Sequence, residues 1–237
     1  MTQLSVNINK VATIRNARGG DFPNVILFAK KSETYGADGI TVHPRPDERH
    51  ITYQDVRDVK ENINIEFNVE GYPSKDFLNL VLEVLPDQVT LVPDPPDVIT
   101  SNSGWDIKNN FDFLKDVIWQ LRQAGIRTSV FVSTDLVQIE YASKIMTDRI
   151  ELYTEDYSKN HKINPNQAIS SYLKAANLAN KFNLGINAGH DLNLDNLKFF
   201  ADKIPSLLEV SIGHALISDA LYLGLENTIQ IYKRQLS

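Results

Sequence analysis

Short runs rich in β-branched residues recur eight times along the chain, and longer stretches with helical periodicity separate them. The strand candidates cover residues 4–8, 39–43, 63–69, 88–92, 127–132, 149–153, 184–188 and 208–213. Residues 116–125 and 166–183 have helical spacing, and a third helical stretch stops at Pro205. This alternation predicts an α/β fold, and eight strand–helix units predict a closed (β/α)8 TIM barrel. An open doubly wound sheet is the alternative.

The length and composition suit one barrel domain over residues 1–237, since no linker, low-complexity segment or charge block divides the chain. The net charge of −6 argues against a nucleic-acid partner, so we expect basic clusters to bind small anions. The chain has no cysteine, which excludes disulfides, thiolate catalysis and Cys-ligated zinc. It also shows no secretory signal and no apolar run long enough to span a membrane. We therefore expect a cytoplasmic protein without a membrane partner.

Four of the five histidines lie at or just after predicted strand ends or on the loop that follows one. They are His43, His50, His190 and His214. Catalytic groups of these barrels lie on the loops at the C-terminal face, and imidazole can act as acid or base near neutral pH. Glu70 closes the third predicted strand and could act as a base if its pKa is raised. The pattern predicts an acid–base site; a metal site is less expected, because His43 and His50 lack a carboxylate at ligand spacing.

Basic residues gather in two segments, 6–23 and 43–50, each of which begins at or within a predicted strand. They are Lys10, Arg15, Arg18, Arg45 and Arg49. The planar fork of arginine suits phosphate. Gly213 and His214 open a helix directly after the eighth strand, where backbone N–H groups can bind an anion. Ordinary polar loops and a tight β-to-α turn are the alternatives, but two basic sites favour two phosphorylated small-molecule substrates.

Six motifs occur in a fixed order along nearly the whole chain: VNI..VATIRNARG at 6–19, GADGITVHPRPDERHI at 36–51, NVEGYP at 68–73, TLVPD at 90–94, GINAGHDLN at 185–193 and IGHALISDAL at 212–221. Together they resemble the pyridoxine 5′-phosphate synthase family. The resemblance implies a barrel that assembles as a homo-octamer and needs no metal or organic cofactor. It also implies condensation of 1-deoxy-D-xylulose 5-phosphate with 3-amino-2-oxopropyl phosphate to pyridoxine 5′-phosphate, phosphate and water.

The resemblance also implies residue roles. His43 and Glu70 match proton acceptors, His190 matches the proton donor, and Glu151 matches a carboxylate that stabilises charge. The residues expected to hold the aminoketone phosphate are Asn7, Arg18, Asp191, Gly213 and His214. Those expected to hold the deoxyxylulose phosphate are Asn9, Lys10, Arg45, His50 and Thr100.

The chain departs from the family pattern at two places. Asn9 and Lys10 stand where the family often has Asp-His, so a carboxylate and an imidazole become an amide and a fixed cation. Asp191 stands where the family has glycine, and its carboxylate would have to point away from any phosphate. Residues 94–106 form a long polar stretch on the C-terminal face, which we expect to close over the site. Two other functions stay open: another phosphosugar barrel enzyme, such as an isomerase or aldolase, and a non-catalytic phosphate-binding barrel.

Overall fold

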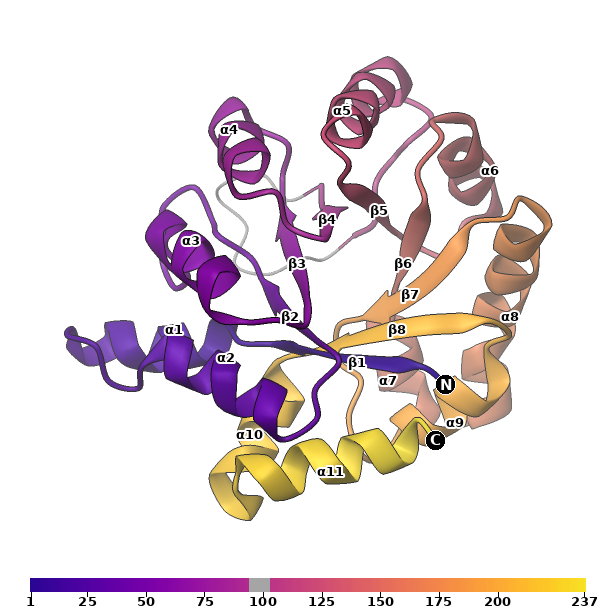
Figure 1. Ribbon diagram of the computed structural model, residues 1–237. Coiled ribbons are helices and arrows are strands. Elements are labelled where there is room, and N and C mark those ends of the chain that lie inside the picture. Colours follow the sequence, from indigo (N-terminus) through magenta and orange to yellow (C-terminus); the bar gives the residue numbers. More distant parts are fainter. Residues whose placement is uncertain (94–102) are drawn as a thin grey trace.

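The structure is a computed structural model that describes residues 1–93 and 103–237. Eight parallel strands pair in sequence order and close on themselves, β1 with β8, so the predicted barrel is confirmed and the open sheet is excluded. Figure 1 shows the strands in the middle of the molecule with the helices around them. The strands are β1 (Gln3–Asn7), β2 (Gly39–Val42), β3 (Glu66–Gly71), β4 (Gln88–Leu91), β5 (Arg127–Val132), β6 (Arg149–Tyr153), β7 (Gly185–Gly189) and β8 (Leu207–Ile212).

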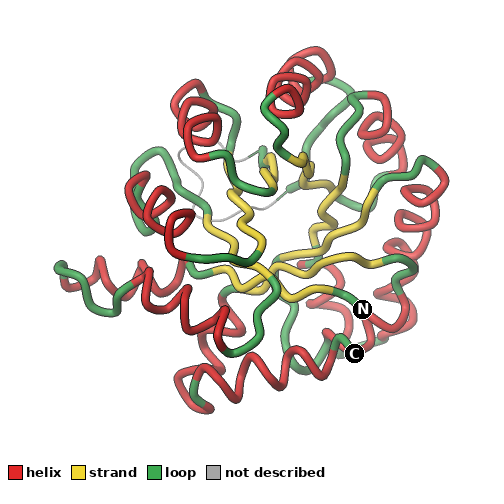
Figure 2. The backbone as a smooth tube through the Cα atoms, viewed as in Figure 1, coloured by secondary structure: helices red, strands yellow, loops and turns green. Residues whose placement is uncertain are grey.

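Helices connect the strands and form the outer layer, as the tube in Figure 2 shows. They are α1 (Asn9–Arg18), α2 (Val25–Thr34), α3 (Tyr53–Asn62), α4 (Lys75–Val84), α5 (Phe111–Gln123), α6 (Leu136–Lys144), α7 (Glu155–His161), α8 (Pro165–Lys181), α9 (Leu197–Lys203), α10 (His214–Leu223) and α11 (Leu225–Gln235). Among the described residues, none of these helices combines the length and the apolar character that crossing a membrane requires.

Local sequence signals fix several helix starts. Thr52 caps α3 through a capping box with Asp55, in which each side chain accepts from the other residue's backbone N–H. Asn164 caps α8, and Pro165 occupies its first turn, where a missing N–H costs nothing. The predicted helix at 166–183 is therefore confirmed with a shift of one or two residues at its ends.

The strands alternate between two buried faces. Their outward residues are mostly apolar and pack under the helices, as with Val69 of β3 and Val130 of β5. The inward residues are largely polar and hydrogen-bonded, for example Ser5 with Thr41 at 2.6 Å between hydroxyl oxygens. Because the barrel interior is polar along its length, it can hold ionisable side chains beneath an open mouth.

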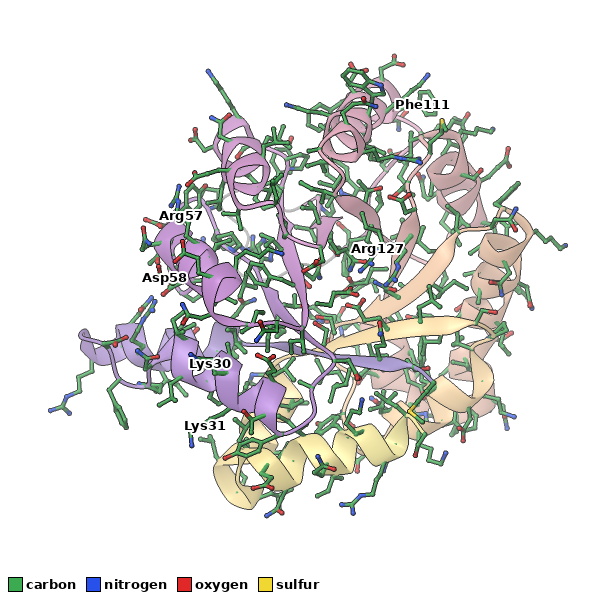
Figure 3. The ribbon with its side chains drawn as sticks, viewed as in Figure 1. Lys30, Lys31, Arg57, Asp58, Phe111 and Arg127 are labelled. Carbon is green, nitrogen blue, oxygen red and sulfur yellow. The ribbon has the colours of Figure 1, made fainter. Side chains whose placement is uncertain are left out.

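The N-terminal end of the barrel is occupied by ion pairs. Arg127, which Figure 3 labels within the ring of strands, pairs with Glu66 and donates to Gln88 at 2.9 Å. Arg149 pairs with Glu209 at 3.0 Å. The two pairs neutralise the charged side chains at the first positions of β3, β5 and β6 and at Glu209 inside β8. They lie at the opposite end of the barrel from the predicted site.

Candidate active site

The C-terminal end of the barrel carries a cavity of about 600 Å³. Most residues that the sequence predicted for the site line it: Asn7, Asn9, Lys10, His43, Arg45, His50, Glu70, Glu151, His190, Asp191, Gly213 and His214. They come from the ends of five different strands, the loops that follow them and the interior of the barrel. This is the face on which barrels of this kind keep their catalytic groups.

Among the described residues, one predicted site residue is not brought into this cavity. Arg18 ends α1 and is exposed, and Thr100 lies outside the described residues. The expected lid over residues 94–106 also lies mostly outside them. Its last residues are described, and Trp105 there is buried, with its indole N–H donating to the Leu91 carbonyl at 3.0 Å. The described end of the segment near Trp105 is therefore anchored on the barrel.

Arg49, one of the basic residues that the sequence analysis found suited to phosphate, also lines the cavity. Other side chains there were not assigned from the sequence: Thr13, Val92, Phe131, Glu155 and Ser211. Two of them could have been found by the rule that active residues lie near the C-terminal ends of the strands. Glu155 opens the helix after β6, and Ser211 lies on β8 two residues before Gly213. Its hydroxyl lies 3.4 Å from Oε1 of Glu70, which adds a polar neighbour to that carboxylate.

His43 lies beside Glu70, with Nδ1 3.8 Å from Oε2. Both side chains are largely enclosed, at 8% and 12% exposure. The backbone N–H of His43 donates to Oδ1 of Asn9 at 2.9 Å, which ties the loop after β2 to the start of α1. Burial, reinforced by the positive charge of Arg45, lowers the pKa of His43 well below 6.5. The imidazole is therefore neutral at neutral pH and can accept a proton.

Glu151 points into the barrel from β6 and is 3% exposed. Burial, and then the negative charge of Glu70, raises its pKa well above 4.5. Its carboxyl group therefore keeps its proton to a higher pH than an ordinary glutamate does, and the protonated form can donate a hydrogen bond or a proton. Gly189 of the neighbouring strand leaves room for it, since a Cβ at that position would lie 2.1 Å from Oε1 of Glu151.

His50 contributes a second neutral imidazole. Burial and the charges of Arg45 and Lys10 lower its pKa to about 4. The backbone N–H of Ile51 donates to its Nδ1 at 2.9 Å, so the neutral ring carries its proton on Nε2. With Lys10 and Arg45 in the same cavity, the group offers cationic and N–H donors suited to a phosphate or to sugar hydroxyls.

Arg15 was grouped with the phosphate-binding residues, and the structure gives it another role. It forms a bidentate pair with Asp55, at 2.6 and 2.8 Å, and also donates to the carbonyl of His50 at 3.1 Å. Its fork is thus occupied by the carboxylate at the start of α3. Arg15 holds the loop that carries His50 against α1.

The opposite side of the cavity is formed by residues from β1, β7 and β8. Gly213 precedes α10 and packs so closely on Asn7 that a Cβ would lie 3.1 Å from that side chain. His214 begins the helix, where backbone N–H groups and the helix dipole favour an anion. His190 follows β7, and its Nδ1 lies 2.6 Å from Oδ2 of Asp191. The Asp191 carboxylate, which was expected to point away from any phosphate, therefore contacts His190.

Within residues 1–93 and 103–237 there is no group of three or more His, Asp or Glu side chains arranged to hold a metal ion. The cavity instead combines a neutral histidine beside a carboxylate, a buried carboxyl group of raised pKa, a histidine paired with an aspartate, and basic residues on one wall. Such a set can move protons at several points of one bound substrate.

Comparisons with known proteins agree with this arrangement. Over residues 4–237 the chain matches the family described as "Pyridoxal phosphate biosynthesis protein PdxJ". It is 62% identical over 233 residues to pyridoxine 5′-phosphate synthase of Bacteroides thetaiotaomicron, with 98% of each chain covered. It is 57% identical to the enzyme of that name from Porphyromonas gingivalis over 237 residues, 100% of both chains.

Solved structures with the same fold are more distant. Phosphoribosylanthranilate isomerase of Thermotoga maritima gives a TM-score of 0.60 at 15% identity, covering 100% of this chain and 98% of that one. A mutant tryptophan synthase α-subunit of Pyrococcus furiosus gives 0.62 at 12% identity, covering 99% and 97%. At such identities these matches show the barrel fold alone, whereas the full-length matches above show descent: the chain belongs to the PdxJ family of pyridoxal phosphate biosynthesis proteins.

Proposed function

We propose that this chain is a pyridoxine 5′-phosphate synthase that condenses 1-deoxy-D-xylulose 5-phosphate with 3-amino-2-oxopropyl phosphate. The observation that carries the proposal is its full-length identity of 57–62% to enzymes of that name. The cavity supports it, since the four residues expected to move protons or stabilise charge all line one space. They are His43, Glu70, Glu151 and His190.

The reaction is a sequence of proton transfers around carbon–nitrogen and carbon–carbon bond formation. The amine adds to the ketone and loses water, phosphate is eliminated, water adds, and ring closure and dehydration follow. Each step needs a base to remove a proton or an acid to protonate a leaving oxygen. The neutral imidazole of His43 suits the first task, with Glu70 at 3.8 Å to stabilise the imidazolium that forms. The carboxyl group of Glu151, whose raised pKa favours its protonated form, suits the second.

Two phosphorylated substrates need two anion sites. We assign the deoxyxylulose phosphate to the wall with Lys10, Arg45 and His50, where cations and an Nε2–H donor gather. We assign the aminoketone phosphate to the side where Gly213 and His214 begin α10. The family resemblance adds Arg18, at the end of α1, to the aminoketone phosphate site, and Thr100, which lies outside the described residues, to the deoxyxylulose phosphate site.

We further propose a homo-octamer in the cytoplasm, as the family resemblance implies. Light scattering on the purified protein tests the assembly: a mass about eight times that of one chain is expected, and a monomer or dimer would contradict it.

Another phosphosugar barrel enzyme is the second candidate, since the more distant structures include an isomerase and an aldolase. Those matches show the fold alone. Enzymes of this type commonly hold one phosphate, whereas basic or N–H donors lie on two sides of this cavity, which favours the condensation.

The test is an incubation of the purified protein with both substrates, following phosphate release and the fluorescence of the pyridoxine ring. Both signals should rise only when both substrates are present. His43→Asn should fold normally and lower kcat by roughly 10²- to 10⁴-fold, the usual contribution of a general base. His161→Asn is the matched control, because His161 packs against Tyr157 and Phe199 outside the cavity. Full activity of His43→Asn, or an equal loss in both variants, would contradict the assignment.

A further inference from the structure

Asp191 shares the cavity with His190, and its carboxylate oxygen Oδ2 lies 2.6 Å from the imidazole Nδ1. We propose that Asp191 is a positioning residue for His190: it accepts the Nδ1 proton, fixes the plane of the ring, and leaves Nε2 as the nitrogen that exchanges a proton with substrate. This proposal rests on the proposed function, in which His190 is the proton donor. It gives a role to the one residue of the Gly-His-Asp motif that departs from the family pattern.

The direction of the hydrogen bond follows from the charge on Asp191. The hydrogen bond from His190 lowers the pKa of Asp191, burial opposes the shift, and the charge of Lys159 lowers it further. The carboxylate is therefore ionised at neutral pH and can only accept. Nδ1 of His190 must then be the donor, which selects one arrangement of the ring protons.

The backbone that carries the pair is clamped from two elements. His190 and Asp191 both have positive φ, 76° and 60°, a conformation that costs energy for residues other than glycine. The buried hydroxyl of Thr154 donates to the carbonyls of Gly189, at 2.9 Å, and His190. The buried amide of Asn196 donates to the carbonyl of Asp191 at 3.2 Å. The pair therefore stands on a preformed turn rather than on a free loop.

The imidazole is also held on its flank. The ring of Tyr153 meets it edge to face, with centroids 5.0 Å apart and planes at 78°. The Tyr153 hydroxyl donates in turn to Glu155 at 2.8 Å, which fixes the phenol. Asp191 and Tyr153 together leave the ring little freedom, and an acid held in one orientation loses less entropy when it meets the substrate.

The competing role for the same carboxylate is to repel a substrate phosphate bound near Gly213 and His214. The two roles separate kinetically. Loss of a positioning residue lowers kcat with KM nearly unchanged, whereas loss of a repulsive charge lowers the KM of the phosphorylated substrate.

The experiment is a double-mutant cycle with Asp191→Gly and His190→Gln, measuring kcat and the KM of each substrate. Glycine adopts positive φ freely, so Asp191→Gly keeps the turn and removes only the side chain. We expect kcat to fall about 10- to 100-fold, the usual effect of removing a partner that orients a functional imidazole. In the His190→Gln background, the same change should have almost no further effect on kcat. Asp195→Asn is the matched control, since Asp195 lies on the same segment but its carboxylate pairs with Lys162 at 3.5 Å.

Three results would overturn the proposal. Asp191→Gly could keep the kcat of the wild type; it could act only through a lower KM; or its loss of kcat could be as large without His190 as with it.

A separate measurement keeps the proposal testable if the wild type fails to turn over the two substrates, a failure that would count against the proposed function alone. Nitrogen-15 spectra of histidine-labelled protein should show His190 protonated on Nδ1 in the wild type, and this preference should be lost in Asp191→Gly. An unchanged His190 spectrum would refute the pairing.

Discussion

Gly189 offers the sharpest test of the site, because its missing side chain is what makes room for the carboxyl group of Glu151. A Cβ at position 189 would lie 2.1 Å from Oε1 of Glu151, and ordinary contacts of this kind begin near 3.4 Å. Gly189→Ala must therefore displace the carboxyl oxygen by about 1.3 Å, the difference between these distances. The φ angle of Gly189 is not in the left-handed region, so the backbone itself accepts alanine.

The size of the effect follows from this displacement. Misplacing a catalytic group by about 1 Å can cost roughly 10²-fold in rate, so we expect kcat to fall by about that factor. Overpacking a buried site costs about 1–3 kcal/mol of folding stability. We expect the lower end of that range, because the end of the Glu151 side chain can turn into the open cavity.

Steady-state phosphate release and thermal unfolding of the same preparations separate the two effects. Gly185→Ala is the control on the same strand, since its Cβ would meet Cγ of Arg149 at 2.7 Å and Cδ1 of Leu208 at 3.0 Å. It should lose stability and keep kcat, because Gly185 begins β7 away from the cavity. If Gly189→Ala retains the kcat of the wild type, or if the two variants lose activity alike, the reasoning about Glu151 is refuted.

Two further predictions concern charge and burial. The raised pKa of Glu151 means that its protonated form stabilises the fold fully below pH 4.5, and this stabilisation is lost as the pH rises through the raised value. Glu151→Gln should therefore gain stability relative to the wild type in thermal melts as the pH rises above 4.5; a difference independent of pH would contradict the raised pKa. Arg15→Ala should cost about 3 kcal/mol in chemical denaturation, because it leaves the enclosed carboxylate of Asp55 without its ion pair. A loss below about 1 kcal/mol, typical of a surface pair, would show that water replaces the arginine.

Hydrophobic periodicity predicts most of the fold. The start of β3, which was predicted wrongly, shows what periodicity does not predict. Residues 63–69 alternate as a strand should, but β3 covers Glu66–Gly71. Ile63 is extended and buried, yet it serves as the C-terminal cap of α3, and pairing with β2 starts only where Glu66 meets Gly39. A strand is defined by its partner, which is a long-range property. Glu70 therefore lies within the strand, facing the interior, rather than on the loop after it.

The site shows the same division between local and long-range information. The sequence places histidines and arginines near strand ends, but it does not say which carboxylate each will meet. Arg15 meets Asp55, 40 positions away, and so is withdrawn from phosphate binding. Burial then shifts the pKa values of two site residues in opposite directions. In water a glutamate loses its proton before a histidine does, whereas here the pKa of His43 is lowered and that of Glu151 is raised. These shifts favour His43 as the group that accepts a proton and Glu151 as the group that donates one, and both shifts depend on the barrel being closed around the two side chains.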